Sequence, residues 1–247
     1  MVLTICAARA LSRIGGVIQS ALRWRAARAK PAGGTRCVRS ESCVGTISLL
    51  KHMLAALETV PPSPPRLRLT RADCAVLETN GLLDQERVEL IEGDLIQRMP
   101  KNWPHVHIIM VLYRWMSQVF GFEYVLQEAP INVAPEDNPT NEPQPDLIVM
   151  NRRSELKSAK PNPADLRLIV EVSDSTLGFD TTVKAALYAR AGIAEYWVFD
   201  VNGRRLGVHR EPRHGTFQSI VWYSGAESVA PLAAPDVRFA AGSPFGP

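Results

Sequence analysis

The segment from Leu166 to Val201, LRLIVEVSDSTLGFDTTVKAALYARAGIAEYWVFDV, contains the pattern that decides the fold. Its two apolar runs are typical of buried strands, and the stretch between them, which stops at Gly192, indicates a helix. The first run carries one acid, Glu171, and the helix carries Lys184. An ionised carboxylate in an apolar strand is destabilising unless it is paired or binds a metal ion. The segment therefore predicts an α/β fold in which Glu171 has a partner.

A second apolar strand also begins with an acid, and we expect it to lie beside the first. Asp146 opens the run DLIVM, and Glu171 lies near the end of the strand that starts at Leu166. If the two strands pair antiparallel, the start of one and the end of the other meet at the same edge of the sheet. The two carboxylates are therefore predicted to converge, although 25 positions separate them in the chain.

Two converging carboxylates repel each other, and a divalent cation between them removes that repulsion. Ligand sets made of oxygen atoms favour Mg²⁺ or Mn²⁺ over Zn²⁺. Such a cation lowers the pKa of bound water and stabilises charge on a phosphate, and Lys184 could neutralise further charge. The spacing is also compatible with a structural role, in which Asp146 caps a loop, Glu171 pairs with an arginine and Lys184 is solvated.

The first 65 residues differ in composition from the rest of the chain. Residues 1–40 contain eight Lys or Arg and no Asp or Glu, and four prolines stand between Pro61 and Pro65. This composition is typical of a disordered extension or targeting peptide, or of translated sequence upstream of a later start at Met53. We therefore predict a basic extension over residues 1–65 and a folded domain over residues 66–247.

The positive net charge belongs to that extension. Removing the eight cations of residues 1–40 from the net charge of +3 leaves −5 for residues 41–247, so the basic pI does not indicate nucleic-acid binding. No apolar run approaches the roughly 20 residues that cross a bilayer. The four cysteines show neither metal-type spacing nor a disulfide framework, so we expect a protein of the reducing cytoplasm.

Other patterns predict elements around the sheet. The run RVELIEGDLIQR, residues 87–98, indicates a hairpin in which Glu89 faces away from its apolar neighbours. Apolar residues at helical spacing over residues 105–120 predict an amphipathic helix with His105 in its first turn. Asp180 stands at the N-cap position of the helix that carries Lys184. Beyond the hairpin turn Asn202-Gly203, strand signals weaken after Pro212.

Several of these blocks together resemble the Uma-two family of restriction endonucleases, a branch of the PD-(D/E)XK nuclease superfamily. The resemblance rests on RVELIEGDLI, NEPQPDLIVM, LIVEVSDST and FDTTVKAALYARAGIAEYWVFD, which occur in the order found in the family. It covers roughly residues 68–215 and does not reach residues 1–65. It implies a restriction-endonuclease-like α/β fold, with a mixed central β-sheet flanked by helices.

The resemblance also implies roles for individual residues. Asp146, preceded by a proline, matches the superfamily's first acid and Glu171 its second, and these two with the carbonyl of Val172 would hold Mg²⁺ or Mn²⁺. The superfamily's lysine usually stands two positions after the second acid, where this chain has Ser173. In the Uma-two branch a lysine lies on the next helix, so Lys184 is the candidate.

Two further residues match family positions. Glu89 matches the acid of the opening hairpin and would bind a second metal ion or its water. His105 would contact phosphate, with a capping or packing role as the alternative.

The resemblance therefore implies a metal-dependent endonuclease that hydrolyses phosphodiester bonds in nucleic acid, with DNA as the expected substrate. A homodimer is compatible with such an activity. The alternative is a module of the same fold that binds nucleic acid or a partner without turnover. Because the domain is acidic, a nuclease needs a local basic patch, and candidates lie in the loop after the Asp146 strand: Arg152, Arg153, Lys157 and Lys160.

Overall fold

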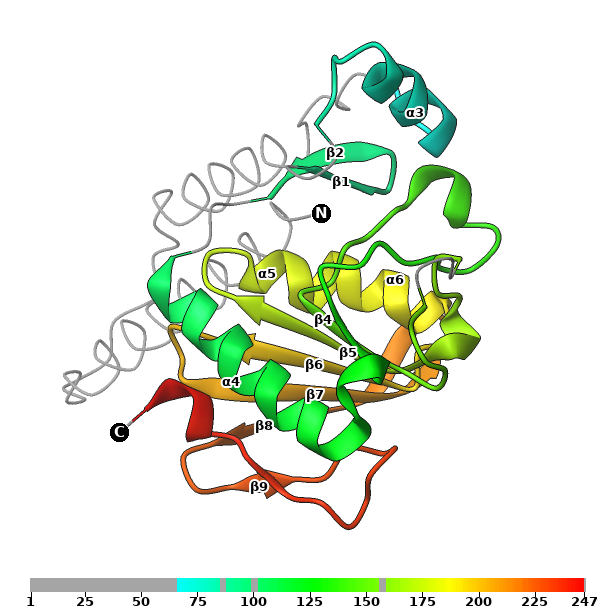
Figure 1. Ribbon diagram of the computed structural model, residues 1–247. Coiled ribbons are helices and arrows are strands. Elements are labelled where there is room, and N and C mark those ends of the chain that lie inside the picture. Colours follow the sequence, from blue (N-terminus) through cyan, green and yellow to red (C-terminus); the bar gives the residue numbers. More distant parts are fainter. Residues whose placement is uncertain (1–65, 85–87, 99–101, 156–158, 247) are drawn as a thin grey trace, which may run out of the picture. The chain divides into compact units, whose positions relative to one another are not determined.

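A mixed six-stranded β-sheet forms the centre of the fold in the computed structural model (Figure 1). The structure describes residues 66–84, 88–98, 102–155 and 159–246. In spatial order the strands are β3 (Val125–Gln127), β4 (Leu147–Met150), β5 (Leu166–Ser173), β6 (Glu195–Asp200), β7 (Arg205–Arg213) and β8 (Thr216–Ser224). The predicted α/β fold with a mixed central sheet is confirmed.

The pairing of β4 with β5 is the feature that brings the predicted acids together. Leu147 lies opposite Val170 in an antiparallel pair, as expected from the sequence. Strands β5 and β6 are parallel, so the chain crosses over between them through a helix. This helix consists of α5 (Leu177–Phe179), a π-helical turn (Asp180–Lys184) and α6 (Ala185–Arg190).

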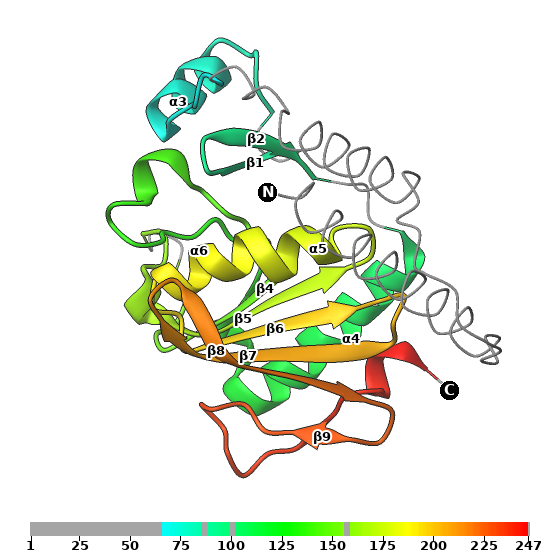
Figure 2. The same ribbon diagram turned by 180° about the vertical axis from the view of Figure 1, so that it is seen from behind.

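Helices cover both faces of the sheet, as Figures 1 and 2 show from opposite sides. Helix α4 (Trp103–Phe120) packs on one face through Ile108, Ile109, Leu112 and Met116. Helix α6 packs on the other face through Ala185, Tyr188 and Ala189. Side chains of β5 alternate between these layers, with Val170 and Val172 toward α4 and Ile169 toward α6. By the same alternation, Glu171 points toward the α5–α6 side.

The N-terminal part of the described domain contains helix α3 (Arg71–Thr79) and the hairpin of β1 (Val88–Ile91) and β2 (Asp94–Gln97). A capping box between Thr70 and Asp73 starts α3. The hairpin turns at Glu92 and Gly93, both with positive φ, and a Cβ on Gly93 would lie 2.7 Å from Cβ of Arg68. The predicted hairpin over residues 87–98 is confirmed for its described residues.

The C-terminal part is more regular than its weak sequence signals indicate. Strand β8 pairs with β7 along its whole length, and β9 (Ser228–Val229) pairs antiparallel with β10 (Phe239–Ala240). Short 3₁₀ turns complete the fold: η2 (Phe122–Tyr124), η3 (Asn138–Thr140), η4 (Pro163–Asp165) and η6 (Ser243–Phe245). Within the described ranges, no helix has the length and apolar character needed to cross a membrane.

Candidate active site

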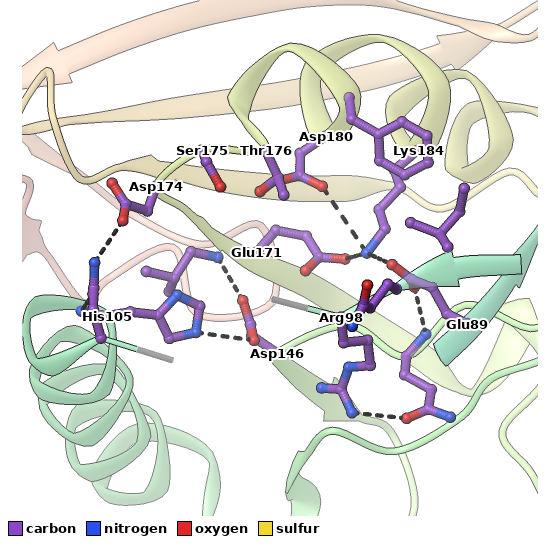
Figure 3. Close-up of a pocket in the computed structure, with 16 residues that line it drawn as sticks. Glu89, Arg98, His105, Asp146, Glu171, Asp174, Ser175, Thr176, Asp180 and Lys184 are labelled. Carbon is purple, nitrogen blue, oxygen red and sulfur yellow. Dashed lines mark hydrogen bonds and ion pairs between the residues drawn. The ribbon is translucent and has the colours of Figure 1, made fainter. Parts of the chain in front are cut away.

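A cavity of about 170 Å³ lies at the end of β5, where α4 and α5 both begin (Figure 3). Its lining contains every side chain predicted to be catalytic, together with the predicted phosphate contact: Glu89, Asp146, Glu171, Lys184 and His105. These residues come from β1, the start of β4, β5, the π-helical turn and the first turn of α4. The fold therefore joins at one place residues that are nearly 100 positions apart.

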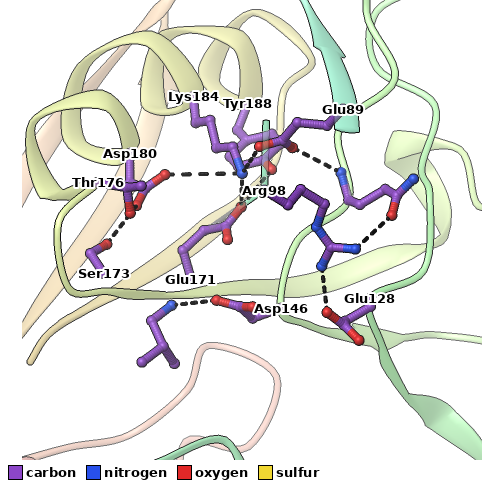
Figure 4. A network of polar contacts seen from close by, with 12 residues as sticks. Glu89, Arg98, Glu128, Asp146, Glu171, Ser173, Thr176, Asp180, Lys184 and Tyr188 are labelled. Carbon is purple, nitrogen blue, oxygen red and sulfur yellow. Dashed lines mark hydrogen bonds and ion pairs between the residues drawn. The ribbon is translucent and has the colours of Figure 1, made fainter. Parts of the chain in front are cut away.

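Lys184 forms the centre of the charge network in this cavity (Figure 4). Its Nζ atom lies 2.9 Å from Oε1 of Glu89, 2.9 Å from Oε1 of Glu171 and 4.0 Å from Oδ1 of Asp180. Burial alone would lower the pKa of Lys184, but the three carboxylates raise it above its ordinary value. Since the side chain is only 4% exposed and stays charged, Lys184 is not a solvated helix residue.

Glu171 is buried on β5 and shares one oxygen between two donors. Its Oε1 accepts a hydrogen bond from Lys184 at 2.9 Å and another from the Tyr188 hydroxyl at 3.1 Å. Burial raises the pKa of Glu171 well above its ordinary value; Lys184 opposes this shift, and nearby acids, Asp180 first among them, add to it. The sequence predicted that Glu171 has a partner. Its partners are Lys184 and Tyr188, and not an arginine.

Asp146 stands just before β4 and is held by the backbone of β5. Its Oδ2 accepts the N–H of Val172 at 2.8 Å. Nε2 of His105 is buried 3.4 Å from Oδ1, which is longer than a good hydrogen bond. Burial acts to raise the pKa of Asp146, but His105, the Val172 N–H and Lys184 outweigh it, so the pKa falls below its ordinary value. Asp146 is thus kept as the carboxylate.

Asp180 does not cap a helix, contrary to the prediction. The helix already begins at Leu177, and Asp180 lies inside it with helical backbone angles, as the first residue of the π-helical turn. Its Oδ2 accepts hydrogen bonds from the hydroxyls of Ser173 (2.7 Å) and Thr176 (2.6 Å). Burial raises the pKa of Asp180 despite Lys184 and these hydroxyls. Single π-helical turns are frequent at functional sites, and this one carries two side chains of the cavity.

The β1–β2 hairpin supplies Glu89 and is tied to the loop before β4. Besides Lys184, Glu89 accepts the backbone N–H of Gln144 at 3.2 Å. Arg98 follows β2, donates to Oε1 of Gln144 at 3.0 Å and pairs with Glu128 (Figure 4). These contacts fix the position of the hairpin acid within the cavity.

Sequence reasoning missed a polar link between α4 and the loop after β5. Asn102 caps α4 by accepting the N–H of His105 at 3.0 Å, and it donates to Asp174 at 2.5 Å. Asn202 donates to the same carboxylate at 2.8 Å. The signal for Asn102 was present, because an asparagine shortly before a proline is a common helix start. No sequence pattern marked Asp174.

The predicted basic patch after β4 does not present free charges among its described members. Arg152 lies 3.3 Å from Asp165, Arg153 lies 3.2 Å from Glu123, and Lys160 pairs with Glu142. Lys157 lies outside the described residues. The described cations of this loop are therefore paired with acidic side chains of neighbouring segments.

The residues present fit a divalent cation by their chemistry. Four buried carboxylates, on Glu89, Asp146, Glu171 and Asp180, surround the single ammonium of Lys184, and a divalent cation would reduce this excess of negative charge. Mg²⁺ characteristically uses one or two carboxylates and keeps several water ligands. The N–H and C=O of a strand residue point the same way, so the Val172 carbonyl faces the side of Asp146. In the described part of the chain, no three acidic, histidine or cysteine side chains gather closely enough to form a ligand cage by themselves.

The fold of the chain is found in another solved structure. It is similar to a crystal structure described as "a putative nuclease belonging to DUF820" from Anabaena variabilis ATCC 29413, with a TM-score of 0.52 and 16% sequence identity. The similarity covers 68% of this chain and 95% of that chain. At this level of identity it shows a shared fold.

The family follows from the sequence itself. The model of the Uma2 family, described as "Putative restriction endonuclease", matches residues 77–242. Since this match spans well over half of the chain, the protein belongs to the Uma2 family. No curated protein matches the chain.

Proposed function

We propose that this protein is a metal-dependent endonuclease that hydrolyses phosphodiester bonds in nucleic acid, with DNA as the expected substrate. The observation that carries the proposal is the buried contact of Lys184 with Glu171 and Glu89 beside Asp146, in a member of a restriction endonuclease family. Four buried acids and one lysine are not needed for the stability of a core, because hydrophobic side chains of the same volume are often at least as stabilising.

In this proposal Asp146, Glu171 and the carbonyl of Val172 would hold Mg²⁺ or Mn²⁺. The bound cation would supply a water of lowered pKa and would stabilise negative charge on the phosphate. Lys184 holds the carboxylate of Glu171 in place and offsets charge next to the reacting phosphate.

Two further residues have supporting roles in the proposal. Glu89 orients Lys184 through their shared contact and is fixed in turn by the Gln144 backbone. His105 lies on the α4 side of the cavity, beside Asp146, where its imidazole would contact the phosphate.

Nicking of supercoiled plasmid DNA by the full-length protein tests the proposal. The reactions contain Mg²⁺ or Mn²⁺, or a chelator, and compare the wild type with Asp146→Asn and Glu171→Gln. We expect metal-dependent nicking that falls by about 100-fold or more in both variants, since several kcal/mol of transition-state stabilisation depend on the cation.

Glu227→Gln is the matched control, because Glu227 is an exposed acid that caps a turn at Ser224 by accepting its N–H at 2.8 Å. It should nick as fast as the wild type. If the wild type cuts neither DNA nor RNA with either metal, the endonuclease proposal fails. Binding of nucleic acid that needs no metal and survives Asp146→Ala would then favour the binding module.

A further inference from the structure

The two edges of the central sheet differ in how they are protected. At one edge, β3 is three residues long, and beside it Ser154 donates its N–H to the carbonyl of Glu123 at 2.9 Å. At the other edge, β8 is nine residues long and pairs only with β7 among the described strands. A long edge strand presents a row of backbone donors and acceptors to which another strand can add.

The composition of β8 lacks the devices that usually prevent such pairing. Its sequence, TFQSIVWYS, contains no charged residue, no proline and no glycine. Natural edge strands are commonly protected by a lysine, a proline or a short length. Valine, isoleucine, threonine and aromatic residues, which favour strands, make up most of β8.

Both faces of the sheet are exposed at the middle of this edge strand, at Ile220 and Val221. Ile220 and Val221 are neighbours in β8, so their side chains point to opposite faces. They are 50% and 44% exposed, whereas the residues opposite them on β7, His209 and Val208, are buried. Side chains are therefore buried on β7 but exposed on β8, the next strand, because no described helix or loop covers the sheet at these two positions.

We propose that β8 pairs antiparallel with β8 of a second copy of this chain, so that two central sheets form one continuous twelve-stranded sheet about a two-fold axis. In an antiparallel pair of identical strands, a charged residue near the two-fold axis would face its own copy, and β8 has no charged residue. Residues 41–247 carry a net charge of −5, so an uncharged strand is a favourable place for two copies to meet. At about 3.4 Å per residue, nine residues give a contact about 30 Å long.

Sedimentation velocity of the full-length protein, between about 1 and 100 µM, tests this interface, since a contact of one strand per copy is small and its occupancy should depend on concentration. The wild type should shift from monomer to dimer over this range. Ile220→Lys and Val221→Lys should each raise the dissociation constant more than about tenfold, because lysine blocks edge pairing. Matched controls are Met110→Lys and Leu232→Lys, which alter apolar residues that are 58% and 51% exposed elsewhere. The controls should dimerise as the wild type does.

Hydrogen exchange of the wild type gives a second measurement that needs no variant. Amides of residues 216–224 should exchange more slowly at high than at low protein concentration, while those of β3 should not change. A wild type that stays monomeric throughout, or lysine variants that dimerise as the wild type does, would overturn the proposal. Exchange in β8 that is independent of concentration would do the same.

Discussion

At the scale of single residues, the cavity is an unbalanced group of charges. Lys184 is the one ammonium among four buried carboxylates, and it contacts two of them directly. Removing the lysine therefore leaves buried acids without compensation, whereas removing one acid reduces mutual repulsion. The two kinds of substitution should have opposite effects on folding stability.

We predict that Lys184→Met lowers the free energy of unfolding by about 3–5 kcal/mol, the usual cost of removing one partner from a buried ion pair. Glu171→Gln should leave the free energy of unfolding unchanged or higher, because burial and neighbouring acids already disfavour its charged form. Urea unfolding at neutral pH in the presence of a chelator measures both without bound metal.

Lys160→Met is the control for these measurements, because its pair with Glu142 is partly exposed and such pairs contribute about 0–1 kcal/mol. A Lys184→Met protein as stable as this control would mean that the lysine does not compensate the acids. A strongly destabilised Glu171→Gln protein would mean that the acid is a structural anchor.

The sequence revealed these acids but not the burial of the lysine. An acid inside an apolar strand is conspicuous, and Glu171 could be identified for that reason. A lysine on a helix has the same appearance in sequence whether it is solvated or buried. Which applies depends on how the helix is rotated against the sheet, and the π-helical turn at Asp180–Lys184 changes that rotation locally.

At the scale of elements, the crossover helix begins four residues before the predicted start, with its N-cap at Thr176 and not at Asp180. Asp180 precedes a helical pattern, as an N-cap would, yet the helix extends back to Leu177. The carboxylate is bound by hydroxyls that precede the helix, on Ser173 and Thr176, and not by backbone N–H groups. Its burial beside Lys184 is a tertiary effect, so local capping rules could not predict it.

We predict that Ser173→Ala destabilises the protein by about 1–3 kcal/mol, the cost of leaving a buried acceptor without one of its donors. Ser173 is fully buried and donates to Asp180 at 2.7 Å. Ser175→Ala is the matched control two residues away, since Ser175 is exposed, and it should change the free energy of unfolding by less than about 0.5 kcal/mol. Equal values for the two variants in urea unfolding would show that the hydroxyl contact adds nothing.

At the scale of the whole molecule, apolar and alternating runs predicted strands and the pairing of β4 with β5, and the family resemblance implied the mixed sheet, but the far edge of the sheet was not predicted. Strand β8 was only weakly indicated after Pro212, because its length depends on pairing with β7 along the whole hairpin. The extent of this pairing depends on the tertiary context in which β7 is held against β6, and a local pattern does not contain that context. The basic patch failed for a related reason, since the acids that neutralise it come from other parts of the chain.

The division between the basic extension and the domain leads to a prediction about the complete chain. Residues Pro65–Pro247 form a compact unit, and the family match lies within it. Residues 1–65 hold nine Lys or Arg and two Glu, so removing their net +7 from +3 changes the charge to −4. A chain that starts at residue 66 should therefore keep its melting temperature but bind DNA more weakly, because cations that can neutralise phosphates are gone.

Fluorescence anisotropy with labelled duplex DNA at several salt concentrations measures this effect. The slope of log K against log salt should be shallower for the shortened chain, by about 0.9 for each phosphate contact that is lost. An unchanged slope would mean that residues 66–247 carry the non-specific binding. Loss of the melting transition in the shortened chain would mean that the folded domain needs residues 1–65. If cavity-dependent nicking persists while the slope falls, the extension concentrates the protein on DNA and the cavity carries out the chemistry.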